Sequence, residues 1–170
     1  MNIPMPERGE LALKGPESDQ LTAWIDFYRS TLLMKCAGLS VEQLSDASVP
    51  PSTMTLLGIL RHMTTVEQYW YQVIFAGRDV ELFYKSVDRD GDFNNLGDTE
   101  LSEVVRRFDA ACDEARGIVR GHDPSEIAPA LRHGKQVDLR WIQLHMIEEY
   151  ARHCGHADLI RECIDAVTGY

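Results

Sequence analysis

The feature that most constrains the fold is a long segment near the end of the sequence that can only be helical. Residues 138–166 contain no proline and a single glycine, Gly155. Asp138, at the start of the segment, is a residue type that often caps a helix N-terminus. Apolar side chains recur along the segment at helical spacing. A helix of this length must bury its apolar side against partners of similar length, so the rest of the chain has to supply them.

Three further segments have the apolar periodicity of helices, and strand-like alternation is poor throughout. They span roughly residues 18–38, 55–76 and 99–120, the last opening with Thr99 and Ser102, and Gly38, Gly77 and Gly121 mark their ends. Four long amphipathic helices predict an all-α fold, a four-helix bundle.

The remaining segments are read as an arm and connections. Residues 1–16 are rich in proline and glycine and predict an extended N-terminal arm, with the bundle domain over 17–170. Residues 39–54, 77–98 and 122–137 predict connections. The run Asp88-Arg89-Asp90-Gly91-Asp92 is similar to a calcium loop but lacks the EF-hand spacing and its distal glutamate, so we interpret it as a plain acidic loop.

Composition excludes several classes of function. The 27 acidic residues outnumber the 17 basic ones and give a net charge of −10, which argues against a nucleic-acid partner. No apolar run reaches the ~20 residues of a membrane span, and no signal peptide is recognisable at the N-terminus. The four cysteines form no CxxC pair, which favours reduced thiols and a cytoplasmic location.

The long C-terminal segment carries a stripe of groups that can bind metal. At ~100° per residue, His145, Glu149, His153 and His156 fall within ~80° of one another, beside the apolar face. Glu148 falls outside this arc and is expected to face solvent. Groups four residues apart on a helix lie ~5–6 Å apart at their Cβ atoms, close enough to share one divalent ion.

A pair on one helix needs a third ligand from another, and His62 is the strongest candidate because it lies on the apolar face of the 55–76 segment. Simpler interpretations stay open. His62 alone could be a hydrogen-bonded core histidine, and Glu149 with His153 could be a surface ion pair. Yet three histidines and a glutamate on one stripe suit a buried core poorly, because buried polar groups need partners.

Two segments resemble a known family. His145–Gly169, HMIEEYARHCGHADLIRECIDAVTG, and Leu56–Gly77, LLGILRHMTTVEQYWYQVIFAG, resemble the DUF664 (mini-circle protein) branch of the DinB/YfiT-like superfamily, and the acidic stretch DRDGDF also looks like it. The resemblance covers most of residues 20–169 and implies a four-helix bundle. It further implies a metal site made by His62, Glu149 and His153, with the glutamate variant similar to mycothiol-dependent maleylpyruvate isomerases.

The resemblance also implies a function. We expect a divalent metal, zinc or nickel, and an enzyme that activates a low-molecular-weight thiol such as mycothiol, or water, against a small-molecule electrophile. His156 and His145 are the candidates for moving the proton, although either could instead be a ligand or structural. Cys154 is interpreted as a packing or surface residue, because its helical phase points it away from this stripe. Arg61, Arg140 or Arg152 would attract an anionic substrate to the site. Segments 77–98 and 122–137 would shape the mouth of the pocket.

An alternative function stays open. In a non-catalytic metal-binding or stress-response protein, the metal would stabilise the bundle, and His156 would complete a closed set of four ligands. A homodimer is compatible with both interpretations.

Overall fold

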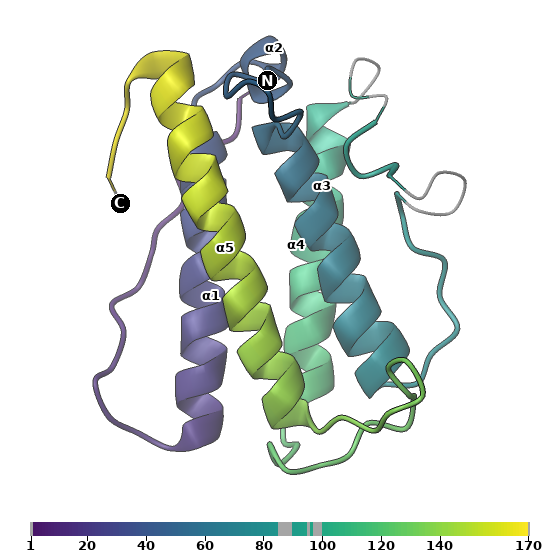
Figure 1. Cartoon of the computed structure of the whole chain (residues 1–170). Coiled ribbons are helices and arrows are strands. Elements are labelled where there is room, and N and C mark those ends of the chain that lie inside the picture. Colours follow the sequence, from purple (N-terminus) through teal and green to yellow (C-terminus); the bar gives the residue numbers. More distant parts are fainter. Residues whose placement is uncertain (1, 85–89, 95, 97–99, 170) are drawn as a thin grey trace.

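The computed structural model describes residues 2–84, 90–94, 96 and 100–169. Over this part of the chain the fold is all-α, as predicted, and four long helical rods form a bundle (Figure 1). The rods are α1 (Glu17–Cys36), α3 (Leu56–Glu67) continued by the π-helix η1 (Gln68–Phe75), α4 (Leu101–Val119) and α5 (Leu139–Asp165). A four-residue helix, α2 (Val41–Leu44), links α1 to α3 and was not predicted.

The rods run in two directions. α1 and α5 point one way, and α3 and α4 point the other way, so the chain after η1 travels back along the bundle before α4 begins (Figure 1). α1 packs mainly against α5, and α3 packs mainly against α4. α3 also contacts α5, and this contact brings together the two segments that carry candidate ligands.

Local chemistry sets the helix boundaries close to the predicted ones. The Thr55 hydroxyl accepts a hydrogen bond from the Gly58 backbone N–H, and the Asp138 carboxylate accepts one from Trp141 N–H at 2.7 Å. Gly77 follows η1 with a φ of 63°, a left-handed conformation that glycine adopts without strain. Two predicted features, Thr99 and the Asp88-Arg89 part of the acidic run, lie outside the described residues.

The N-terminal segment is non-helical up to Pro16 and packs on the bundle. Ile3 is buried in the core, and its carbonyl accepts a hydrogen bond of 2.9 Å from the Gly38 N–H. The Arg8 guanidinium donates to the Thr31 hydroxyl of α1 at 3.0 Å. The segment is therefore held against the bundle at Ile3 and Arg8, while the division into an arm and a bundle domain stays a prediction.

A buried ion pair ties the rods together inside the core. Arg29 of α1 donates two hydrogen bonds to the Glu67 carboxylate of α3, at 2.8 and 2.6 Å, and the Tyr150 hydroxyl of α5 donates to the same carboxylate at 2.6 Å. Glu67 and Tyr150 are 0% exposed and Arg29 is 4% exposed. A carboxylate in this position is stable only because three donors replace its water.

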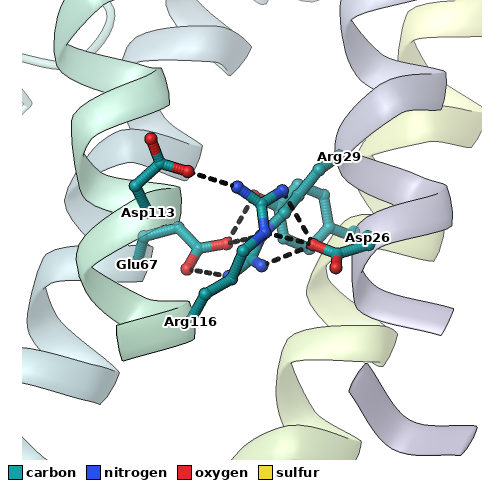
Figure 2. Close-up of polar contacts among 6 residues, drawn as sticks. Asp26, Arg29, Glu67, Asp113 and Arg116 are labelled. Atoms are coloured by element: carbon teal, nitrogen blue, oxygen red, sulfur yellow. Dashed lines mark hydrogen bonds and ion pairs between the residues drawn. The ribbon is translucent and has the colours of Figure 1, made fainter. Parts of the chain in front are cut away.

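The pair continues toward the surface through α4. Arg29 and Arg116 both donate to Asp26, at 2.8 and 2.9 Å, and Arg116 also reaches Asp113 (Figure 2). Burial opposes ionisation of Asp26, but the hydrogen bonds from Arg116 and Arg29 outweigh it and lower the pKa of Asp26. Burial likewise opposes the charge of Arg29, yet the Glu67 carboxylate raises the pKa of Arg29 well above its ordinary value. The network therefore stays ionised and joins all four rods.

None of the helices in the described part of the chain is both long and apolar enough to cross a membrane.

Removing one charge from the buried pair should destabilise the protein more than removing one charge from a surface pair. Glu67→Gln removes the fully buried counter-charge of Arg29 and leaves only the more exposed Asp26, so it should lower the free energy of unfolding by ~3–5 kcal/mol. The matched control is Glu114→Gln, which breaks the exposed pair with Arg78 and should cost less than about 1 kcal/mol. Urea unfolding of both variants measures the two losses. Similar losses for both variants would show that the buried pair does not hold the rods together.

Candidate metal centre

On α3, His62 is held by a carboxylate from the chain that follows η1. Its Nδ1 lies 3.0 Å from Asp92 Oδ2, and the Thr65 hydroxyl donates to the other oxygen, Asp92 Oδ1, at 2.7 Å. Asp92 is 1% exposed. Because an ionised carboxylate only accepts hydrogen bonds, His62 donates through Nδ1 and keeps Nε2 free as a ligand atom.

On α5, Glu149 and His153 lie one turn apart and face His62. Glu149 Oε2 lies 3.6 Å from His153 Nε2, and the His62 and His153 rings are 4.9 Å apart at their centroids. Each of the three residues offers a ligand atom within 4.8 Å of the other two. The hydrogen bond with His153 lowers the pKa of Glu149 although burial opposes this, so Glu149 is a carboxylate at neutral pH.

The other two histidines of the stripe contact these residues from outside. His145 Nε2 lies 3.3 Å from Glu149 Oε1, and His156 Nδ1 lies 3.4 Å from His153 Nδ1. Burial lowers the pKa of His156, and so does the neighbouring His153. Glu148 is exposed, as the helical phase predicts, but its carboxylate also reaches His145 Nδ1 at 3.4 Å and pairs with Arg152.

These residues fit a divalent metal ion. Two imidazoles and one carboxylate are a ligand set that zinc and nickel accept. The contact between His62 and Asp92 is the carboxylate–histidine arrangement that orients imidazole ligands in metal sites. A second group, formed by His145, Glu148 and Glu149, also brings ligand atoms within 4.8 Å, but it is more exposed and shares Glu149 with the first. The first group is therefore the better candidate.

A cavity of about 640 Å³ opens beside His145, between η1, the start of α5 and the segment before it. Trp70 of η1 and Trp141 of α5 form one side, with their ring centroids 5.3 Å apart, and His145 stacks on Trp141. Segment 122–137 supplies much of the other side. The described residues of segment 77–98 do not line this cavity, but they provide Asp92 to His62.

The three arginines expected to attract an anionic substrate lie elsewhere. Arg61 donates to the backbone oxygens of Gly91 and Asn94 and packs over the Tyr84 ring. Arg140 pairs with Glu17, and Arg152 pairs with Glu148. None of the three lines the cavity, because each is engaged in a contact of its own.

Cys154 lies beside the site in sequence but points away from it. It is 5% exposed, and its thiol donates to the Tyr28 carbonyl of α1 at 3.8 Å. Burial raises the pKa of Cys154 to about 12, so the thiol stays protonated and unreactive at neutral pH.

Comparison with models of known protein families identifies the family of this chain. The model described as Mycothiol-S-transferase matches residues 20–166, nearly the whole bundle. The chain belongs to the mycothiol S-transferase family. This agrees with the resemblance to the DinB/YfiT-like superfamily, while the assignment to the DUF664 branch stays a prediction. No curated protein matches the chain closely enough to count as a relative.

Sequence reasoning about this family member missed Asp92, the carboxylate that holds His62. The acidic run was noticed for calcium and otherwise interpreted as a plain acidic loop, yet Asp92 is buried against α3. Phe93 was missed as well, and its ring stacks on His62 with a centroid distance of 5.5 Å. Helical periodicity cannot find either residue because both lie in irregular chain.

The close approach of Phe93 to α3 depends on Gly58. A Cβ at Gly58 would lie 2.5 Å from Phe93 Cδ1, so the ring and the adjoining Asp92 would have to move. We expect Gly58→Ala to lower the free energy of unfolding by ~1–3 kcal/mol and to shift the His62 ring resonances. Gly117→Ala is the control, because nothing lies within 4 Å of its Cβ, and it should stabilise α4 by ~0.5–1 kcal/mol. Thermal unfolding and NMR measure both effects, and unchanged His62 resonances in Gly58→Ala would contradict this account.

Proposed function

We propose that this protein is a metal-dependent S-transferase that joins mycothiol to a small-molecule electrophile. The metal ligands would be His62, Glu149 and His153, and the metal would be zinc or nickel. The observation that carries the proposal is the convergence of these three ligand atoms from two rods, with His62 oriented by Asp92, in a member of the mycothiol S-transferase family.

A divalent ion bound by the three side chains would supply Lewis acidity, which lowers the pKa of a coordinated thiol. His145 is placed to accept the proton that the thiol releases, because it lies against Glu149 and also lines the cavity. The cavity holds the electrophile beside His145. The sulfur then bonds to the electrophilic carbon, and the leaving group departs with its electron pair. In an addition to a double bond, the displaced electron pair moves to the neighbouring atom, which takes a proton from His145.

His156 has a different role in this proposal. Its Nδ1 contacts His153 Nδ1, on the side of the ring opposite the Nε2 that faces Glu149. We therefore assign His156 to orienting His153 rather than to moving the proton. The proposed setting is the cytoplasm, where small thiols are kept reduced.

The non-catalytic alternative requires a closed set of four protein ligands. His156 was the candidate for the fourth, but its contact with Nδ1 of His153 favours a supporting position. Among the described residues, the group that includes His62 contains three ligand residues. A position left for a thiol supports catalysis over a purely structural metal.

The ligand set predicts the metal content of single variants. Protein purified without a nickel column should carry close to one divalent ion per chain, measured by mass spectrometry of the metals. His62→Ala and His153→Ala should abolish binding, and Asp92→Asn should weaken it ~10–100-fold because His62 loses its orienting partner.

Two controls make the metal measurement specific. His122→Ala removes an exposed histidine that pairs with Glu126 outside the site, and it should leave the metal content unchanged. Glu148→Gln tests the second group of ligand residues and should also retain the metal. If Glu148→Gln lost the metal while His62→Ala kept it, the ion would belong to the group of His145, Glu148 and Glu149.

The transfer reaction is tested with purified protein, mycothiol and a panel of electrophiles, with the products weighed by mass spectrometry. We expect a mycothiol adduct that forms at least ~100-fold more slowly with His153→Ala, because metal activation contributes several kcal/mol to such steps. Glu114→Gln, on the surface of α4, should react at the unaltered rate. Adduct formation that is equally fast in His153→Ala would exclude the metal from the reaction.

A further inference from the structure

The cavity beside His145 has an aromatic side that faces the candidate metal centre. Trp70 is 4% exposed and its ring packs edge-on against His145 at 4.8 Å, while Trp141 is 46% exposed and lies nearly parallel to the His145 ring, 5.2 Å away. Flat aromatic faces bind planar apolar groups by stacking. A molecule that fills this end of the cavity lies against His145, and His145 in turn contacts Glu149, one of the residues that would hold the metal.

The cavity lining also contains two cationic side chains. Arg132 and Lys135 form a tight turn in which each backbone N–H donates to the carbonyl of the other, at 2.9 and 3.0 Å. The two residues between them, His133 and Gly134, have φ values of 49° and 75°, as in the two-residue turns that join antiparallel strands. Residues paired across such a turn present their side chains on the same side, so the two cations lie side by side.

The rest of the segment fixes this turn against the bundle. Ala128 N–H donates to the Val137 carbonyl at 2.8 Å, and Leu139 N–H donates to the Glu126 carbonyl at 2.9 Å. The Arg132 guanidinium lies over the rings of Tyr69 and Trp70, with distances of 5.7 and 5.6 Å to the ring centroids. The sequence interpretation of 122–137 as an irregular connection missed this ordered, hairpin-like structure.

The two cations keep their charge available for a ligand. Within the part of the chain that the structure describes, no carboxylate forms an ion pair with Arg132 or Lys135. Asp138 also lines the cavity, but its carboxylate caps the first turn of α5. Unpaired basic side chains are notable in a protein with a net charge of −10, because the overall charge opposes the binding of anions.

We propose that this cavity binds the electrophilic substrate, and that this substrate is a planar aromatic molecule carrying a carboxylate or another anionic group. The aromatic part stacks on the exposed Trp141 ring, which packs against the buried Trp70, and the anionic group pairs with Arg132 and Lys135. A cationic aromatic molecule would also stack on tryptophan, but the two basic side chains repel it. The assignment as a reacting substrate rests on the proposed transferase function, whereas the binding preference can be measured without any reaction.

The test compares two probes of the same shape by titration calorimetry. We expect 2-naphthoate to bind about tenfold or more tightly than the uncharged 2-naphthylmethanol at low salt, and the difference to shrink as salt screens the charges. The double variant Arg132→Gln/Lys135→Gln should remove the preference, and Trp141→Ala should weaken both probes about fivefold or more. Thermal unfolding of each variant confirms that it is folded before binding is measured.

Two controls distinguish this binding site from an effect of net charge and from the proposed transfer reaction. The double variant Lys14→Gln/Arg106→Gln removes two exposed positive charges elsewhere and should keep the preference, which excludes an effect of net charge alone. His153→Ala should lose metal and transfer activity yet bind 2-naphthoate within about twofold of the unaltered protein. Equal affinity for the two probes, or equal losses in the two double variants, would overturn the proposal, even if mycothiol transfer were observed.

Discussion

The buried carboxylate of Glu67 fixes how α3 lies against α5, and the candidate metal centre depends on that alignment. Its partners Arg29 and Tyr150 come from α1 and α5, so Glu67 can be satisfied in only one register of the three rods. Tyr150 lies between Glu149 and His153 in sequence, and His62 precedes Glu67 by little more than one turn. The hydrogen bond between Tyr150 and the buried Glu67 therefore also aligns His62 with Glu149 and His153.

The same antiparallel alignment extends from the metal centre to the cavity. His62 contacts His153, Glu67 contacts Tyr150 one to two turns farther along α3, and Trp70 contacts His145 beyond that. Each step toward the C-terminus of the α3–η1 rod is a step toward the N-terminus of α5. The candidate metal ligands, the buried anchor and the aromatic side of the cavity are therefore successive levels of one helix–helix contact.

The parts that the sequence could predict are those governed by helical periodicity. The spacing of Glu149 and His153 requires only that residues 138–166 form one regular helix, and the structure has that helix from Leu139 to Asp165. Cys154 was correctly interpreted as a packing residue by the same reasoning, because its phase differs from that of His153. His62 needed one further assumption, that its apolar face turns toward α5.

The parts that the sequence could not predict come from irregular chain. Asp92 reaches His62 across 30 residues, and no repeat or motif marks an aspartate that will be buried beside a histidine. The pairing of Arg132 with Lys135 could not be predicted either, because it depends on the left-handed backbone conformation of His133 and Gly134. The expectation that arginines would attract an anionic substrate drew partly on residues of α5, where Arg140 and Arg152 already form ion pairs with Glu17 and Glu148.

The π-helix explains why one rod can serve both the metal centre and the cavity. Eight residues separate His62 from Trp70, and an α-helix would turn by two revolutions plus about 80° over that distance. In the π-helix Gln68–Phe75 the backbone bonds span five residues, as between Ala76 N–H and the Tyr71 carbonyl, so each residue turns through a smaller angle. The π-helix therefore turns Trp70 part of the way back toward the face of His62, and there Trp70 meets His145 of α5.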